Sequence, residues 1–298
     1  MELTVPPPFA IAHPQLRSAG FVYNSPHSGS WYPPDLLDLS PLPLATLRSS
    51  EDSFVDRLFA AAPKLGAPLM MVNVARAYVD TNREPYELDP FMFSGELPQN
   101  ANFDSDRVMA GLGTIPRVVA GNRRIYTRRL PIQDALQRIR TIYIPIQKAL
   151  SGLIEDTRKR FGHAVLIDCH SMPSGATFLR LPLRASADII LGDRHGTSCA
   201  PALIDAAEDC LRGLGYRVTR NLPYSGGFNT QHYGQPLLGL HALQIEINRA
   251  LYMDEKRYEP TAGLAPLSRD LQLMMAALHA LPAPLFRAPS IPYQESAE

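Results

Sequence analysis

The stretch His163-Ala-Val-Leu-Ile-Asp-Cys-His170-Ser171-Met172-Pro173 decides how the rest of the chain is understood. Its apolar part, residues 164–167, is short and rich in β-branched side chains, so it predicts a buried strand. An acid, a thiol, an imidazole and a hydroxyl follow directly. Ligands of open α/β sheets bind just beyond the carboxyl ends of the strands. We therefore expect His170 to be functional, with Asp168 holding its second ring nitrogen. The alternative is a histidine that is satisfied within the core.

The same pattern occurs twice more along the chain. The stretch Phe21-Val-Tyr-Asn-Ser25-Pro26-His27-Ser28-Gly29 again runs from apolar residues into a histidine flanked by turn formers. The stretch Leu240-His-Ala-Leu-Gln244-Ile245-Glu246-Ile247-Asn248-Arg249 places a carboxylate between two isoleucines. Two histidines and a buried glutamate, each at a strand end, indicate one shared cleft.

Apolar runs and helical periodicity predict an α/β fold. The further strands are expected at residues 20–24, 68–79, 187–191 and 216–219. Helices are expected at residues 44–62, 132–160, 198–214 and 264–281, with Pro145 kinking or splitting the second of them. Residues 1–18 are expected to form an irregular arm, residues 84–131 long loops, and residues 284–298 a tail. Because no repeat or linker divides the chain, residues 1–298 are predicted to be a single domain with a largely parallel or mixed sheet.

Composition limits the possible partners. Charged residues make up 19% of the chain, and Lys plus Arg equals Asp plus Glu at 29 each. This balance gives no electrostatic basis for binding nucleic acid or an anionic membrane, so a small-molecule substrate is expected. Three cysteines without Cys-x-x-Cys spacing indicate neither a disulfide framework nor a structural zinc site. No signal peptide or apolar run long enough to span a membrane is evident, and a cytoplasmic location is expected.

Two imidazoles and a carboxylate suit a catalytic zinc ion with an open position for water. Manganese, cobalt and iron accept the same donor atoms. Glu246 has the right chemistry for a general base that takes a proton from water and passes it to a leaving amine. Arg76 is the candidate cation for the oxyanion that forms during attack on an amide. For an acidic amino acid derivative, Arg83 with Asn82 would supply one fork of carboxylate donors, and Arg117 with Arg249 a second.

Other histidines and the thiol are expected to play lesser parts. His195 and His232, near glycine-rich loops, are expected to be supporting groups rather than ligands. Cys169 beside His170 could form a nucleophile and base. Adjacent residues of a strand point to opposite faces, however, which disfavours that pair.

Seven motifs, in order, together resemble the N-formylglutamate amidohydrolase family from about residue 20 to residue 252. They are Ser25-Pro-His27-Ser-Gly29, Asp52-Ser-Phe-Val-Asp56, Arg76 with Asp80-Thr-Asn-Arg83, Gly113-Thr-Ile-Pro-Arg117, Asp168-Cys-His170-Ser171, Gly192-Asp-Arg-His-Gly196 and Gln244-Ile-Glu246-Ile-Asn-Arg249. The resemblance implies a metal-dependent hydrolase with a mixed sheet between helical layers, similar to the zinc carboxypeptidases. It also implies cleavage of N-formyl-L-glutamate into formate and glutamate, late in histidine breakdown.

Carried over to this sequence, the resemblance implies that His27 and His170 are metal ligands, that Glu246 is the general base, and that Arg76 and Arg83 bind substrate. Zinc carboxypeptidases commonly place the carboxylate ligand three residues after the first histidine, where this chain has Ser30. The family pattern instead favours Asp52, with Glu51 as the alternative. Two other hypotheses stay open: the same machinery acting on another N-acyl amino acid, and a metal-free protein that binds acidic amino acids.

Overall fold

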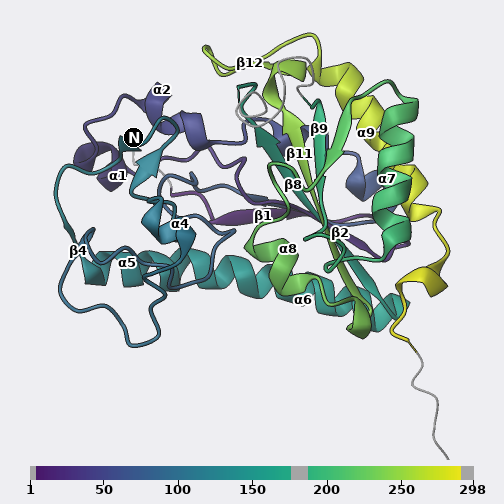
Figure 1. The fold of residues 1–298 in the computed structure, drawn as a ribbon, viewed down its shortest axis with the longest axis horizontal. Coiled ribbons are helices and arrows are strands. Elements are labelled where there is room, and N and C mark those ends of the chain that lie inside the picture. The colour runs from purple at the N-terminus through teal and green to yellow at the C-terminus, as the bar shows by residue number, and fades with distance from the viewer. Residues whose placement is uncertain (1–4, 176–186, 290–298) are drawn as a thin grey trace, which may run out of the picture.

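A seven-stranded mixed sheet forms the centre of the computed structural model, which describes residues 5–175 and 187–289 (Figure 1). Its order is β1-β3-β2-β8-β11-β9-β10, with β2, β3, β8 and β11 parallel to their neighbours within that group. β1 and β9 run antiparallel to β3 and β11. The bounds are β1 Phe9–Ala12, β2 Phe21–Ser25, β3 Leu69–Val72, β8 Ala164–Met172, β9 Ile189–Gly192, β10 Val218–Arg220 and β11 Leu240–Asn248.

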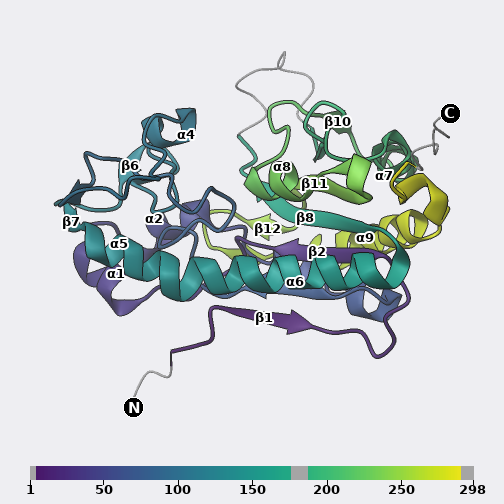
Figure 2. The same cartoon turned by 90° about the horizontal axis from the view of Figure 1, so that it is seen from below.

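Helices cover both faces of the sheet because side chains alternate along each strand. Val22, Leu166 and Ala242 pack on one face against α6 (Ile144–Phe161) and α8 (Phe228–Tyr233). Tyr23 and Ile167 lie on the other face, beneath α3 (Val55–Leu58), α7 (Pro201–Gly213) and α9 (Leu264–His279). Figures 1 and 2 show α6 running along one side of the sheet and α7 and α9 on the other. The prediction of a mixed sheet between helical layers is confirmed.

The predicted helix at residues 44–62 is wrong, because the structure breaks it into short pieces. These are α2 Leu44–Leu47, the 3₁₀ turns η1 Arg48–Ser50 and η2 Ala62–Leu65, and α3. Glu51 is extended, and Phe54 adopts the left-handed conformation with φ 66°. A non-glycine residue in that region interrupts helical hydrogen bonding. Because the helix is broken here, the Asp52 side chain can reach the carboxyl end of the sheet, where it is buried.

The long helix predicted at residues 132–160 is divided at Pro145, as expected. α5 (Ile132–Arg138) passes through a π-helical turn, η3 (Ile139–Tyr143), into α6, and Pro145 lies in the first turn of α6. Proline has no N–H to donate, and its ring crowds the carbonyl group one turn earlier in the helix. The wider π-helical turn before Pro145 makes room for this ring. The two helices together join the sheet to the rest of the molecule (Figure 2).

A second apolar cluster lies beside the sheet and is made by residues from 31–47 and 74–143, which we call the side lobe. It lies at the left of Figure 1 and contains the long loops predicted at residues 84–131. Short elements interrupt these loops: α1 Pro34–Leu39, β4 Phe93–Ser94, α4 Asp106–Met109, β5 Val118–Val119, β6 Arg123–Arg124 and β7 Leu130–Pro131. Leu88, Ile115 and Ile125 are fully buried, so the loops carry their own core.

The described parts of the predicted arm and tail contain regular structure. Part of the expected arm is the edge strand β1, which pairs with β3. Part of the expected tail is the 3₁₀ turn η6 (Ala283–Phe286), and Phe286 is 1% exposed. Residues 1–4 and 290–298 lie outside the described part of the chain. The remaining elements are η4 Pro236–Leu238, η5 Arg249–Leu251, β12 Met253–Asp254 and β13 Glu259–Pro260.

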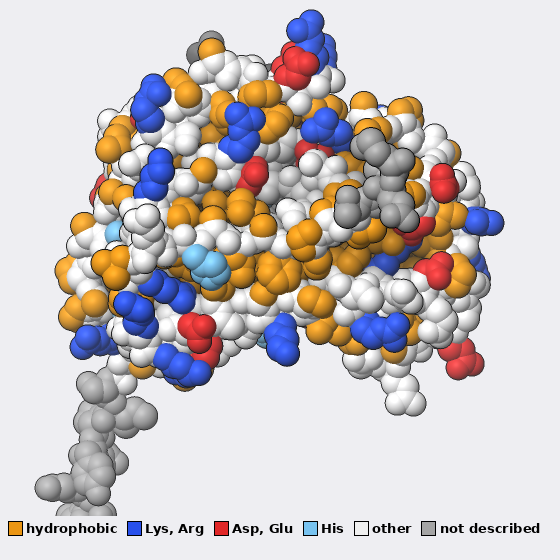
Figure 3. All heavy atoms as spheres, turned by 180° about the vertical axis from the view of Figure 1, so that it is seen from behind, with side chains coloured by type: hydrophobic (Ala, Val, Ile, Leu, Met, Phe, Trp, Pro, Cys, Tyr) orange, Lys and Arg blue, Asp and Glu red, His pale blue; other side chains and the backbone are white. Residues whose placement is uncertain are grey.

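The surface is mixed in character. Basic and acidic side chains are scattered among apolar ones on the face shown in Figure 3, in keeping with a formal net charge of zero. Among the described residues, the helices are all too short or too polar to cross a bilayer.

Candidate active site

A cleft of about 490 Å³ opens beside the carboxyl ends of β2, β8 and β11. The sheet contributes His170 and Glu246 to its lining, the loop after β2 contributes His27, and the broken helical segment contributes Asp52. Residues of the side lobe, Leu112 and Pro116 among them, line it as well. The three stretches singled out in the sequence therefore meet at one place.

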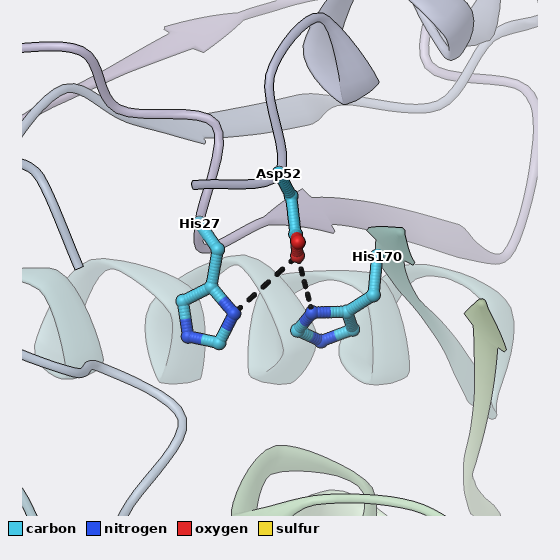
Figure 4. Close-up of side chains that lie close together, drawn as sticks. All are labelled: His27, Asp52 and His170. Carbon is cyan, nitrogen blue, oxygen red and sulfur yellow. Dashed lines mark hydrogen bonds and ion pairs between the residues drawn. The ribbon is translucent and has the colours of Figure 1, made fainter. Parts of the chain in front are cut away.

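His27, Asp52 and His170 converge on one another (Figure 4). The Asp52 Oδ2 atom is 3.1 Å from Nδ1 of His170 and 3.5 Å from Nδ1 of His27. One ligand atom from each residue lies within 4.8 Å of the others, and all three side chains are buried. The Asp52 backbone N–H also donates to the His27 carbonyl at 2.9 Å, which ties the broken helical segment to the histidine loop.

Each imidazole is held from behind by a second carboxylate. Asp80 Oδ1 lies 2.7 Å from Nε2 of His27, and Asp168 Oδ2 lies 2.9 Å from Nε2 of His170. Metal-binding histidines commonly have such partners, which orient the ring and fix its tautomer. The structure brings Asp168 to the ring as the sequence predicted. The same task for Asp80 was not anticipated, although Asp80 stands in one of the seven motifs.

Asp168 is itself the centre of a buried amide network. Its carboxylate accepts hydrogen bonds from Asn24 at 3.0 Å, Asn229 at 3.2 Å and Asn82 at 3.1 Å. Asn82 therefore braces the site, and its amide nitrogen also lies 3.0 Å from Nε2 of His170. Side-chain amides are neutral donors, so they stabilise a buried carboxylate without neutralising it.

The donor atoms fit a cation. Ring N–H groups that donate to Asp80 and Asp168 leave both Nδ1 lone pairs directed at the Asp52 oxygen. Nδ1 of His27 is buried and has no hydrogen-bond partner among the described residues. A buried polar atom without a partner is costly, and a metal ion bound by the three residues would satisfy it. Two nitrogens and one carboxylate oxygen form the kind of set that catalytic zinc uses.

Charge coupling is strong within this group. Burial alone would raise the pKa of Asp52, but the two imidazoles beside it, His170 and His27, outweigh burial and hold that pKa well below its usual value. Burial would lower the pKa of His170, but Asp168 and Asp52 raise it well above its usual value. The site thus keeps the Asp52 carboxylate ionised although this residue is only 1% exposed.

Glu246 stands beside the candidate ligands. It is paired in register with His170 on the neighbouring parallel strand, and it is 8% exposed. Gln244 donates a hydrogen bond to its carboxylate at 2.9 Å. Burial is the main cause that raises the pKa of Glu246, His170 and Arg76 oppose it and Asp52 adds to it, and together they raise the pKa to about 7. A carboxylate with a pKa near neutrality can both accept and return a proton at physiological pH.

The predicted arginines differ in what they do. Arg76 donates from Nε to Asp80 at 2.9 Å and lines the cleft with a side chain that is 23% exposed. Arg83 also lines the cleft, but its Nε and Nη1 atoms donate to the carbonyls of Leu112 and Asn82.

Arg249 is almost fully engaged. Its three guanidinium nitrogens donate to Ser171, to the Ser49 carbonyl and to Asp52, all at 3.0 or 3.1 Å. Although it lines the cleft, this arginine mainly holds Asp52 in place.

Two sequence expectations need correction or refinement. Arg117 does not line this cleft: it pairs with Asp89 at 2.9 Å and faces a second cavity of the side lobe, because the loop turns its side chain toward a local carboxylate. Glu51, the alternative ligand, is held by two hydrogen bonds from Arg48 and one from Tyr32. Of the two adjacent acids, Asp52 is the one that reaches the imidazoles.

The lesser candidates lie apart from the site. His195 is exposed, and His232 is stacked on Phe228 with ring centroids 5.0 Å apart. Neither residue lines the cleft. Cys169 packs in the apolar cluster on the opposite face of the sheet, and burial raises the pKa of its thiol well above the usual value. A thiol held neutral in the core is a poor nucleophile.

Sequence reasoning missed three further groups that line the cleft: Arg107, Arg194 and Tyr224. Arg107 comes from α4 and gave no sequence signal. Arg194 stands in the motif Gly192-Asp-Arg-His-Gly196, and Tyr224 opens the glycine-rich loop that follows β10. The motif was a usable signal for Arg194.

Comparisons with known proteins place this chain among named relatives. The sequence model of the N-formylglutamate amidohydrolase family matches residues 19–253. The N-formylglutamate deformylase of Pseudomonas aeruginosa is 29% identical over 251 residues, which are 82% of this chain and 86% of that protein. The N-formylglutamate deformylase of Pseudomonas putida is 28% identical over 233 residues, 76% of this chain and 79% of that protein.

A solved structure shares the whole fold. The crystal structure of N-formylglutamate amidohydrolase from Ralstonia eutropha JMP134 superposes with a TM-score of 0.87 at 36% sequence identity. The match covers 91% of this chain and 97% of that one.

Proposed function

Since the chain belongs to the N-formylglutamate amidohydrolase family, we propose that it hydrolyses N-formyl-L-glutamate to formate and L-glutamate. The observation that carries this proposal is the convergence of two buried imidazoles on Asp52, with Glu246 in register beside them. These groups lie in a cleft that is lined by arginines, as an anionic amide requires. The fold alone would not support a substrate, because one fold can host many chemistries.

In this proposal His27, Asp52 and His170 hold a divalent metal ion, most naturally zinc. Zinc bound there would lower the pKa of a water molecule to near neutrality and so supply a nucleophile. Asp80 and Asp168 keep the two rings oriented by accepting from their Nε2 atoms. Arg249 holds the Asp52 carboxylate from the other side at 3.0 Å.

Glu246 is the proposed general base. Its carboxylate takes the proton from the attacking water and delivers it to the amide nitrogen as the C–N bond breaks. The raised pKa suits both steps, since a stronger acid would bind the proton too weakly to be an effective base. Gln244 orients the carboxylate by donating to it, and leaves the other carboxylate oxygen for the substrate side.

Arg76 is the proposed electrostatic partner of the reacting carbonyl. Asp80 engages only its Nε, and its side chain is partly exposed in the cleft. Attraction to Asp80 and Asp52 outweighs burial and raises the pKa of Arg76, so it stays cationic. A cation preorganised at this position stabilises the developing oxyanion. Arg83, which also lines the cleft, is the proposed receptor for the α-carboxylate next to the scissile amide, and Asn82 supports it by accepting a hydrogen bond from Arg83 at its backbone carbonyl.

The test is metal content by elemental analysis of the purified protein, combined with formate release from N-formyl-L-glutamate before and after chelation. We expect about one divalent ion per chain, and activity that is lost on chelation and restored by zinc. N-acetyl-L-glutamate and N-formyl-L-aspartate serve as comparison substrates for the acyl and side-chain pockets. A protein that releases no formate with any metal would refute the proposed reaction, and full activity without metal would refute the proposed role of the three ligands.

A further inference from the structure

The cleft contains more cations than its own carboxylates can neutralise. Five arginines line it, namely Arg76, Arg83, Arg107, Arg194 and Arg249. The carboxylates in the lining are Asp52, Asp80 and Glu246. Asp80 pairs with Arg76 and Arg83, and Asp52 pairs with Arg249. Arg107 and Arg194 remain, and a substrate with two carboxylates is the natural partner of such an excess.

Arg194 has the weakest protein partner of the five. Among residues 5–175 and 187–289, its guanidinium makes one hydrogen bond, from Nη1 to the neutral Gly226 carbonyl at 3.3 Å. Within the described residues it has no carboxylate at ion-pair distance, whereas Arg107 lies 3.9 Å from the buried Glu87. A guanidinium without a counterion in a concave, partly dry site attracts anions strongly.

The backbone around Arg194 adopts a conformation that is energetically unfavourable for most residues. Arg194, His195 and Gly196 are three consecutive residues with positive φ, at 55°, 58° and 84°. Left-handed conformations cost about 1 kcal/mol or more for a non-glycine residue and tend to persist at functional positions. The Arg194 N–H donates to the Ser225 carbonyl at 2.7 Å, which fixes this turn to the neighbouring loop.

The neighbouring loop leaves space for the arginine stem. A Cβ atom added at Gly226 would come within 3.1 Å of the Arg194 Cδ atom and 3.0 Å of the Thr230 Cβ atom. Gly226 also has φ +122°, a conformation that other residues rarely adopt. Both loops are thus shaped around one side chain, as expected for a preorganised binding group.

The position of Arg194 indicates which part of the substrate it meets. Glu246 is in register with His170, Arg76 is bound to Asp80, and Arg249 is bound to Asp52, so these groups stand beside the proposed metal ligands, where the reacting amide would lie. Arg194 is instead attached to the loop of residues 223–227, which forms another part of the lining. The α-carboxylate is adjacent to the amide, whereas the side-chain carboxylate extends away from it.

We propose that Arg194 binds the side-chain carboxylate of the substrate and so selects an acidic amino acid. This inference rests on the proposed function and adds the residue that sets its side-chain specificity. The planar guanidinium can donate two parallel hydrogen bonds to a carboxylate, and it would gain the counterion that the protein does not provide.

The experiment compares N-formyl-L-glutamate with N-formyl-L-glutamine, in which a neutral amide replaces the side-chain carboxylate. We expect Arg194→Gln to lower kcat/KM for the glutamate substrate about tenfold to hundredfold more than for the glutamine substrate. Arg194→Lys keeps the positive charge but loses the paired guanidinium donors. Its preference for the glutamate substrate over the glutamine substrate should lie between those of the wild type and Arg194→Gln. Arg107→Gln is the matched variant, since it removes the same charge from the same cleft and should preserve the preference for glutamate.

Controls separate this inference from the proposed function. Arg140→Gln, on the exposed surface of η3, should leave both reactions unchanged. Calorimetric binding of L-glutamate and L-glutamine tests selectivity without any turnover, so it remains informative if no formate is released. A folded Arg194→Gln protein that still prefers the acidic ligand in both assays would overturn the proposal, as would loss of the preference in Arg107→Gln alone.

Discussion

Glu246 and His170 face each other in register across the parallel strands β11 and β8. In-register residues of adjacent strands point to the same face, so the proposed base and a proposed metal ligand emerge side by side from the central sheet. Neither group depends on loop closure for its position.

Replacing Glu246 by glutamine should remove the base and keep the site. The amide oxygen of the new side chain can still accept the hydrogen bond from Gln244, so the local structure should persist. We expect kcat to fall by about 10²- to 10⁴-fold while metal content is unchanged. Elemental analysis and steady-state formate release on the same preparation check both parts. Undiminished turnover would exclude Glu246 as the base.

Asp168 should govern metal affinity although it is not a proposed ligand. In Asp168→Asn the side chain can no longer accept all the hydrogen bonds that Asn24, Asn82, Asn229 and His170 direct at it. Loss of such an orienting carboxylate typically lowers metal affinity about 10- to 100-fold. Competition with a chromophoric chelator measures the change. Asp188→Asn, at a surface pair with Arg217, is the matched control and should retain wild-type affinity.

Replacing glycine by alanine should change the free energy of unfolding in opposite directions at Gly29 and Gly152. At Gly29, next to the His27 loop, a Cβ atom would lie 2.3 Å from the Val74 carbonyl oxygen, so the backbone must move. We expect Gly29→Ala to lower the free energy of unfolding by about 1–3 kcal/mol. At Gly152, on the exposed side of α6, nothing lies within 4 Å of the added atom. Gly152→Ala should raise that free energy by roughly 0.5–1 kcal/mol.

Urea unfolding followed by circular dichroism compares these two variants with the wild type. Gly29→Ala should also weaken metal binding, because it displaces the loop that carries His27, whereas Gly152→Ala should not. Equal effects of the two substitutions would contradict the close approach of the Gly29 loop to the backbone of Val74, which follows β3.

His279 should make stability depend on pH. Its Nε2 lies 3.0 Å from the Tyr23 hydroxyl and its Nδ1 lies 3.3 Å from the Leu65 carbonyl, which suits the neutral ring. Burial lowers the pKa of His279 from 6.5 to about 4. Between these values the unfolded chain binds the proton and the folded one does not, so stability from this group is complete above pH 6.5 and is lost as pH falls toward 4.

The measurement is the free energy of unfolding at pH 7 and pH 5 for the wild type and for His279→Gln. The wild type should lose about 2 kcal/mol more than the variant over this interval. His13→Gln, at an exposed position, should behave like the wild type. An identical pH dependence in His279→Gln would show that the ring titrates normally in the folded protein.

The sequence alone determined the strands that carry the proposed chemistry. Apolar runs that lead to His27, His170 and Glu246 predicted the strands β2, β8 and β11 and a site at their carboxyl ends. A run of apolar, β-branched residues can be recognised from the sequence alone because it is a local property of the chain. The division of the long helix at Pro145 was equally local, since it follows from a missing N–H. The alternation of strands and helices likewise indicated the layered fold.

The tertiary structure alone decided which charges meet. The helix predicted around Asp52 is broken, Asp80 supports His27, Arg117 turns to Asp89, and Arg194 is left facing the cleft. Each of these contacts results from competition among charged side chains, and the outcome depends on how the loops around the cleft fold. Periodicity carries no information about that competition. It places a residue on a face, whereas pairing in three dimensions decides what the residue can bind.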